Sequence, residues 1–195
     1  MADILVPFDF SKNATIALDQ ALLISAANNK KLEVLHITND VVSKEYPKSW
    51  KYSEGEEGKI REKIGEIVAA RAGKFIPGTK PKFTIKIKQS ATISGGLIAN
   101  MLQSGSKLLV MGTHGSSGMY DQIFGSNTAV MVNHSLFPVL VIPHNWKPVS
   151  IEKCIAMFKL SKLNTVSRSI KSWGKFFNSP VEAIQFTISR EAEAG

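Results

Sequence analysis

Apolar positions in the first 143 residues switch repeatedly between strand-like and helix-like spacing. Short apolar runs predict five strands, at 4–8, 32–37, 83–87, 108–111 and 137–142. Apolar residues three and four positions apart predict helices between them, at 11–25, 60–72, 93–102 and 126–134, the first of them capped by Ser11. The polar stretch 39–58 contains glycines and a proline without a clear period, and it is expected to be a loop.

The strict alternation of strands and helices predicts right-handed crossovers and a mostly parallel sheet. In the runs 108–111 and 139–142 consecutive residues are apolar, which is typical of strands covered by helices on both faces. The expected fold class is therefore α/β, a Rossmann-like, doubly wound sheet of five parallel strands. Such sheets bind ligands beyond the carboxyl ends of the strands, where the strand order reverses. The loops after the first and fourth strands are the candidate region.

The last part of the chain is similar in pattern to the first. Laid over the start of the chain with one deletion, it places Cys154 on Ile4 and Val181 on Leu32, which predicts a second strand, helix and strand. Two strands and one helix do not close a core, so this piece either docks onto the first domain or a partner chain, or remains from a lost second half. The expected domains are 1–144, a linker at 145–150 and a partial β-α-β unit at 151–195.

Composition and charge narrow the classes of function. The net charge of +8 is spread along the chain, and Lys86 and Lys88 alternate with isoleucines as the solvated face of a strand does, which argues against nucleic acid as a partner. A single cysteine, Cys154, excludes an internal disulfide and a multi-thiolate zinc site. No long apolar run and no amino-terminal signal pattern is present, so a cytoplasmic protein without a membrane partner is expected.

The clearest chemical signal is a spaced set of glycines: Gly112, two residues, Gly115, nine residues, then Gly125 and Ser126. Gly112 ends a predicted buried strand, and Gly125 and Ser126 open a predicted helix. Glycine lets the main chain approach a ligand closely, and the amide groups at the start of a helix favour an anion. A triphosphate suits this arrangement. Asp9, at the end of the first strand, is placed to accept a hydrogen bond from a ribose hydroxyl or to help hold a metal ion.

This glycine spacing resembles the ATP-binding signature of the universal stress protein family, and the resemblance runs from residue 1 to residue 143. The run Ile4-Leu5-Val6-Pro7-Phe8-Asp9-Phe10-Ser11 resembles the family's opening strand, Leu35-His36-Ile37 the end of its second strand, and Pro138-Val139-Leu140-Val141-Ile142 its final strand. The carboxyl-terminal piece resembles a degenerate second repeat, since Lys159 takes the place of Asp9 and no second glycine pattern follows.

The resemblance implies that ATP, or AMP or ADP, lodges between the first and fourth strands with Mg²⁺, which Asp9 would help to hold through the nucleotide. It also implies a homodimer, which in the family often forms through the final strand. The implied nucleotide-binding residues are Pro7, Ile37 and Met111 near the adenine, Asp9 near the ribose with Ser11 beside it, and Gly112, His114, Gly115, Gly125, Ser126 and Asn127 at the phosphates.

Several of these residues have other interpretations. Asp121 stands where the family often has a basic residue, and it would weaken phosphate affinity if it pointed inward. Lys107 stands where the family often has an acidic residue. The Asp9 carboxylate has a structural alternative as a cap of the following helix. A base or metal-ligand role for His114 is disfavoured because no second ligand stands at a suitable spacing.

Three classes of function follow. The first is a nucleotide-dependent stress-response regulator that binds ATP and hydrolyses it slowly at most, rather than a dedicated enzyme. The second is an ATP-hydrolysing enzyme of the related adenine nucleotide hydrolase superfamily, against which stands the absence of a glycine-rich loop directly after the first strand. The third is a dimeric scaffold that binds a partner and carries a structural nucleotide or none. The first is preferred because the phosphate-binding pattern is intact.

Overall fold

The chain forms two compact units in a computed structural model, Met1–Val149 and Ser150–Gly195. The structure describes residues 2–39, 54–113, 125–134, 137–152, 154–159, 176–177 and 181–186. No helix in these ranges is long and apolar enough to cross a membrane.

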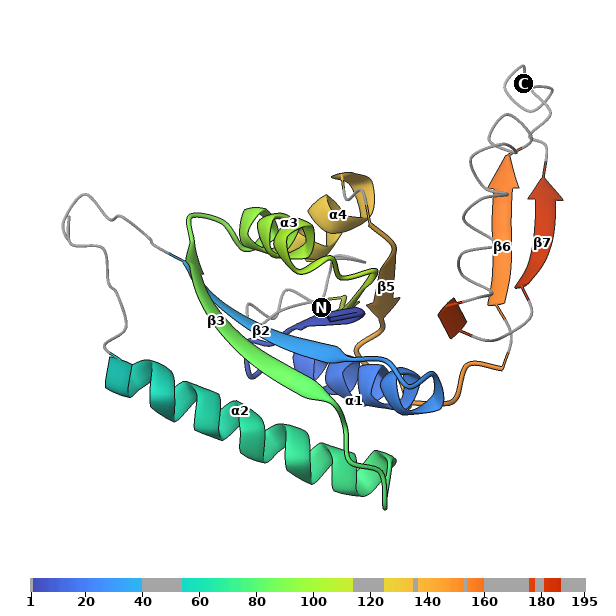
Figure 1. The fold of residues 1–195 in the computed structure, drawn as a ribbon. Helices are drawn as coiled ribbons and strands as arrows, with labels where there is room; N and C mark the ends of the chain where they lie inside the picture. The colour runs from blue at the N-terminus through green and yellow to red at the C-terminus, as the bar shows by residue number, and fades with distance from the viewer. Residues whose placement is uncertain are drawn as a thin grey trace. The chain divides into compact units, whose positions relative to one another are not determined.

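The first unit is built on a parallel sheet of five strands in the order β3-β2-β1-β4-β5 (Figure 1). β1 is central, and its Ile4 lies opposite Leu32 on one side and Leu108 on the other. The strand order therefore reverses between β1 and β4, which confirms the doubly wound α/β fold that the sequence predicted. The strands are β1 (Ile4–Pro7), β2 (Leu32–Asn39), β3 (Phe83–Ser90), β4 (Leu108–Gly112) and β5 (Val139–Ile142).

Four helices cover the two faces of this sheet. α1 (Lys12–Ala27) and α2 (Glu54–Phe75) lie on one face, and α3 (Ile93–Ser104) and α4 (Ser126–His134) lie on the other (Figure 1). α1 begins where the Ser11 hydroxyl accepts a hydrogen bond from the amide of Ala14, as the sequence predicted. α3 ends at Gly105, whose φ of 67° gives the left-handed turn that commonly terminates a helix.

The core differs between the central strands and the edge strand. Ile4, Leu5 and Val6 of β1 have no exposed surface, as expected for a strand covered on both faces. β5 was expected to be covered in the same way, and α1 and α4 do contact it from the two faces, although Val139 to Val141 are only partly buried. In the described part of the chain β5 pairs with β4 and lies at the edge of the sheet. The cluster under α3 and α4 comprises Leu5, Leu35, Leu97, Met101, Leu109, Met111 and Met131.

The predicted loop 39–58 is too long at its carboxyl end, because α2 already begins at Glu54 and includes Gly55 and Gly58. Both glycines are exposed, and a Cβ atom added to either would meet nothing within 4 Å. An interior helical glycine costs about 1 kcal/mol relative to alanine, which burial of Ile64 and Val68 further along the helix offsets. Residues 40–53 lie outside the described part of the chain.

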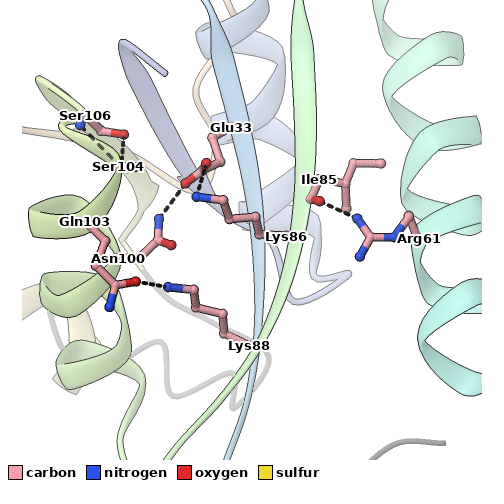
Figure 2. A network of polar contacts seen from close by, with 9 residues as sticks. All are labelled: Glu33, Arg61, Ile85, Lys86, Lys88, Asn100, Gln103, Ser104 and Ser106. Carbon is pink, nitrogen blue, oxygen red and sulfur yellow. Dashed lines mark hydrogen bonds and ion pairs between the residues drawn. The ribbon is translucent and has the colours of Figure 1, made fainter. Parts of the chain in front are cut away.

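Lys86 and Lys88 lie on a partly exposed face of β3, as predicted, with 39% of the Lys86 side chain exposed, and both also make polar contacts. Figure 2 shows both side chains reaching from β3 toward α3. The Lys86 Nζ lies 2.7 Å from the Glu33 carboxylate, which is buried and also accepts a hydrogen bond from the Asn100 side chain. The Lys88 Nζ donates to the side-chain oxygen of Gln103 at 2.6 Å. Polar contacts, rather than water alone, therefore occupy the space between β3 and α3.

The predicted linker at 145–150 is hydrogen-bonded to α1 through Trp146 and Val149. The buried Gln20 of α1 donates to the carbonyl oxygen of Val149 and accepts hydrogen bonds from the Val149 amide and the Trp146 indole. Gln20 thereby makes three hydrogen bonds to the segment that follows β5. This segment is part of the first unit up to Val149.

The second unit contains two parallel strands, β6 (Cys154–Lys159) and β7 (Val181–Phe186). Cys154 lies opposite Val181, just as Ile4 lies opposite Leu32 in the first unit. This is the register that the overlay of the two segments with one deletion predicts. The expected helix between the strands lies outside the described residues, apart from the helical pair 176–177.

Candidate functional site

The candidate site lies where the strand order reverses, beyond the carboxyl ends of β1 and β4. At this point the main chains of the neighbouring strands diverge toward opposite faces of the sheet, which leaves room for a ligand. The end of β4 is tied to β5, because the Thr113 amide donates to the Ile142 carbonyl at 3.0 Å. The elements that border the site are the turn from β1 to α1, the end of β4 and the start of α4.

Gly112 is at the closest approach between β4 and α1. A Cβ atom at this position would lie 2.9 Å from the Cβ of Asn13 and 3.1 Å from its main-chain carbon and oxygen. Real Cβ atoms essentially never come within 3.0 Å of another heavy atom, and 3.1 Å to main-chain atoms is also tight, so a side chain would force α1 away from the strand. Glycine at this position keeps the first turn of α1 packed against the last residue of β4.

Two hydrogen bonds fix the amino terminus of α4 to the end of β4. The Gly125 amide donates to the Thr113 carbonyl at 2.6 Å, and the buried Thr128 hydroxyl donates to the Gly112 carbonyl at 2.9 Å. The helix starts at once, since the Ala129 amide donates to the Gly125 carbonyl. Ser126 and Asn127 are exposed in the first turn of the helix. First-turn amides and the helix dipole favour an anion at this end of α4.

The turn from β1 to α1 forms the other border. The Asp9 carboxylate is exposed and accepts a hydrogen bond from the Ser11 amide at 3.0 Å, while Ser11 caps the helix. Asp9 therefore does not cap α1 itself. Ser11 is the cap, and the Asp9 carboxylate accepts a hydrogen bond from the amide of Ser11. Between them Phe10 has a φ of 64°, in the left-handed region.

Phe10 belongs to an aromatic cluster on the α1 and α2 side of the sheet. Its ring centroid lies 5.3 Å from that of Phe8 and 5.3 Å from that of His36, both in edge-to-face geometry. The Lys63 ammonium of α2 lies 5.2 Å from the Phe10 ring centroid. His36 is buried, and its Nδ1 lies 2.7 Å from the Phe8 carbonyl oxygen. His36 thus holds the end of β1.

The apolar residues expected near an adenine lie at the ends of three adjacent strands. Met111 belongs to the buried cluster under α3 and α4, and Ile37 packs against that cluster. Pro7 ends β1 opposite Leu35. The start of α3 approaches closely, because a Cβ on Gly96 would lie 3.0 Å from the Ile37 Cδ1 atom. These residues form an apolar border on the α3 side, opposite the aromatic cluster.

Several of the predicted site residues cannot be placed. His114, Gly115 and Asp121 lie outside the described residues, so the predictions for them stay predictions. Within the described ranges no group of three or more histidine, cysteine or acidic residues is arranged to hold a metal ion.

The sequence analysis did not assign a role in the site to the residues that support its borders, which are Asn13, Thr128, His36, Lys63 and Gly96. Their partners are distant in sequence, since Thr128 and Gly112 are 16 positions apart and His36 and Phe8 are 28 positions apart. The one available signal was the pair Gly95-Gly96 within an apolar helix pattern, since a glycine inside a helix often marks close packing against a neighbouring element.

Comparison with known proteins identifies the family of the chain and finds solved structures with the same fold. The sequence model of the universal stress protein family matches residues 1–143. None of the curated proteins compared with the chain matches it.

Solved structures of universal stress proteins share the fold at low sequence identity. One, in complex with cAMP, is 19% identical with a TM-score of 0.52, and the match covers 74% of this chain and 100% of that one. A protein from Archaeoglobus fulgidus in complex with dAMP is 14% identical with a TM-score of 0.52, covering 73% of this chain and 98% of that one. A third, from Lactobacillus plantarum, is 22% identical with a TM-score of 0.52, covering 72% and 97%.

Proposed function

The chain belongs to the universal stress protein family, and on this premise we propose that its first unit binds ATP and acts as a nucleotide-dependent regulator of a stress response. AMP and ADP are the alternative ligands at the same site. The observation that carries the proposal is the bonding of the α4 amino terminus to the end of β4, through Gly125 to Thr113 and through Thr128 to Gly112. This bonding holds an anion-favouring helix end at the switch point of the sheet.

The residues around the switch point fit an adenine nucleotide. Pro7, Ile37 and Met111 offer an apolar border for the base, and the exposed Asp9 carboxylate at the end of β1 is assigned to the ribose. Gly112 keeps the main chain bare at the point where β4 meets the loop. Two structures that share the fold were solved with cAMP and with dAMP, which supports an adenine nucleotide as the ligand class.

The phosphates are assigned to the amino terminus of α4 and to the loop before it. Ser126 and Asn127 supply first-turn amides and polar side chains there, Gly112 and Gly125 keep the main chain free of side chains, and His114 and Gly115 complete the proposed set. Ser11 supports the opposite wall by capping α1. Mg²⁺ is proposed to bridge the phosphates with Asp9 as a protein ligand, since magnesium in nucleotide sites takes one or two carboxylates and completes its shell with phosphate and water.

Regulation, rather than turnover, is the proposed output. Rapid phosphoryl transfer needs a positioned base and several charges around the transferred group. The described part of the site offers Asp9 alone as an acidic side chain, which supports slow hydrolysis at most. The chain is proposed to act in the cytoplasm as a homodimer through β5, whose partly buried apolar residues lie at the sheet edge.

The second candidate is a dimeric scaffold that binds a partner protein and carries a structural nucleotide or none. The same half-exposed edge strand favours it, because an edge strand can pair with another chain whether or not a ligand is bound. The two candidates differ in whether assembly responds to ATP. An ATP-hydrolysing enzyme is the third and least supported candidate.

Calorimetric titration with ATP and Mg²⁺ tests the proposal, using wild type, Ser126→Ala and Ser94→Ala. Both serines lie in the first turns of helices, but only Ser126 borders the switch point. We expect micromolar binding by the wild type, several-fold weaker binding by Ser126→Ala, and unchanged binding by Ser94→Ala. No binding by the wild type at millimolar ATP would leave the scaffold as the better candidate. Sedimentation with and without ATP then separates a regulated dimer from a constitutive one.

A further inference from the structure

Phe10 adopts a main-chain conformation that is unfavourable for its residue type. Its φ of 64° is shared, among the described residues that are not glycine, only with Asn29 at 49°. Asparagine visits this region readily because its short polar side chain bonds locally, whereas phenylalanine has no such compensation. An unfavourable conformation persists where the surroundings over-determine it, and such positions gather at ligand-binding sites.

Three elements supply the surroundings that hold Phe10. Its ring packs edge to face against Phe8 from the end of β1 and against His36 from β2, and Lys63 of α2 lies above the ring. His36 is itself fixed by its 2.7 Å contact with the Phe8 carbonyl oxygen. The ring is therefore held by side chains from the end of β1, from β2 and from α2, on the face of the sheet opposite α3 and α4.

The left-handed turn at Phe10 determines the direction of its two neighbours. It brings the Ser11 amide within 3.0 Å of the Asp9 carboxylate, and it lets Ser11 begin α1. A turn with negative φ at the same residue would carry Asp9 in a different direction from the end of β1. The orientation of the Asp9 carboxylate thus depends on a residue whose ring is held on the other side of the sheet.

We propose that Phe10 is a positioning residue for Asp9, and that the clamp of Phe8, His36 and Lys63 sets the selectivity of the site for a nucleotide with ribose hydroxyls. This inference rests on the proposed function, because it assumes that the Asp9 carboxylate accepts a hydrogen bond from the ribose. A carboxylate that is already held in place loses little conformational freedom when it accepts a hydrogen bond from a ribose hydroxyl. This raises the affinity for nucleotides with ribose hydroxyls but not for nucleotides without them.

The test compares the dissociation constants of ATP and 2′,3′-dideoxy-ATP for wild type, Phe10→Gly, Phe10→Tyr and Asp9→Asn. Glycine accepts a φ of 64° without strain, so Phe10→Gly keeps the fold but frees the turn. We expect the wild type to prefer ATP about tenfold, the scale of one hydrogen bond to a charged group. Phe10→Gly and Asp9→Asn are expected to lose this preference, and Phe10→Tyr, which retains the ring, to keep it. All titrations are made without Mg²⁺, so that the proposed role of Asp9 as a metal ligand does not contribute, and affinity for the dideoxy nucleotide is then expected to stay unchanged throughout.

A double variant separates positioning from a general structural role. If Phe10 acts through Asp9, Asp9→Asn combined with Phe10→Gly loses no more ribose preference than either single variant. Equal weakening of both nucleotides in Phe10→Gly would mean that Phe10 only supports the fold, and it would overturn the inference. A wild-type preference that survives in Phe10→Gly would overturn it as well, while leaving the proposed function intact. Failure of the wild type to bind ATP would overturn both.

Discussion

The side chain of Gln20 recognises the main chain of Val149, 129 residues later, through two hydrogen bonds. Its Nε2 donates to the Val149 carbonyl oxygen at 2.9 Å, and its Oε1 accepts from the Val149 amide at 3.1 Å. The same oxygen accepts from the Trp146 indole at 2.8 Å. A buried amide with its hydrogen bonds satisfied in this way gives α1 a specific hold on the segment that leaves β5.

Replacing Gln20 by methionine is expected to release this segment while it preserves side-chain volume. The variant leaves the Val149 amide and carbonyl without their partner, and the free energy of unfolding should fall by about 1–3 kcal/mol. Hydrogen exchange followed by mass spectrometry should show loss of protection at Val149, with faster proteolysis between residues 143 and 153.

Gln103→Met is the matched control for this change, because Gln103 is exposed and bonds only one described side chain, that of Lys88. It should leave exchange at Val149 unchanged. Unaltered protection at Val149 in the Gln20 variant would show that the segment is held by its apolar contacts alone.

The central part of the fold was predictable because its signals are local. β1 and β4 carry continuous apolar runs, and Ser11, Thr92 and Gly105 mark helix ends by their own chemistry. The sheet position of β5 is not a local property. Its apolar run resembles that of β4, and only the strand order decides that β5 is an edge strand with three partly buried residues. The same holds for α1, where Asp19 and Gln20 are both buried although an amphipathic pattern assigns polar residues to the surface.

The candidate site was predictable to the same extent. Gly112 and Gly125 stand out by their spacing, and the structure places them on either side of the Thr113 to Gly125 hydrogen bond. Asn13 and Phe10 carry no such signal, because the roles of both depend on contacts with other strands and helices. A left-handed phenylalanine in particular contradicts local preference, and only the three-dimensional clamp explains it.

Substitution of Gly112 by alanine is expected to separate α1 from β4. The new Cβ would meet main-chain atoms of Asn13 at 3.1 Å, and overpacking of this kind destabilises by about 1–3 kcal/mol. Chemical denaturation measures the loss, and ATP affinity should fall with it because both borders of the site move.

Gly73→Ala provides the matched control for Gly112. Gly73 lies inside α2, and an added Cβ would meet nothing within 4 Å, so alanine should stabilise the protein by about 0.5–1 kcal/mol. Opposite signs for the two glycine-to-alanine changes are therefore expected. A Gly112→Ala variant as stable as the wild type would show that α1 tolerates a shift at its first turn.

Thr128→Val tests whether the bond between α4 and β4 matters for ligand binding beyond its effect on folding. Valine matches threonine in shape but cannot donate to the Gly112 carbonyl, so we expect a stability loss of about 1 kcal/mol. Nucleotide affinity should fall several-fold, because the amino terminus of α4 is no longer fixed at the switch point. Thr15→Val removes a comparable hydroxyl bond, to the Ser11 carbonyl, and serves as the control for stability alone. Equal affinities in both variants would contradict the role given to Thr128.

Arg71→Met is expected to destabilise the protein by leaving the buried Asp19 carboxylate without its partner. Arg71 of α2 makes a two-pronged contact with Asp19 of α1, and the Arg71 side chain is 29% exposed against 1% for Asp19. Breaking a fully buried pair costs about 3–5 kcal/mol, and partial exposure of Arg71 should reduce this to about 2–3 kcal/mol. Lys107→Met, at the exposed ion pair with Asp3, should change stability little.

The stability that Arg71 contributes is expected to stay constant between pH 7 and pH 10. The hydrogen bond from Arg71 to Asp19 raises the pKa of Arg71 above its ordinary value. Partial burial of Arg71 lowers this pKa by less, and the charge attraction to Asp19 raises it further. A raised pKa means that the stability from the protonated guanidinium is fully present below the ordinary value and is lost only as the pH rises through the raised one. The difference in unfolding free energy between wild type and Arg71→Met should therefore be equal at pH 7 and pH 10. Urea titrations at both pH values measure it, and a difference that shrinks by pH 10 would show that the stabilisation does not come from the ion pair, because the Arg71 guanidinium stays protonated over this range.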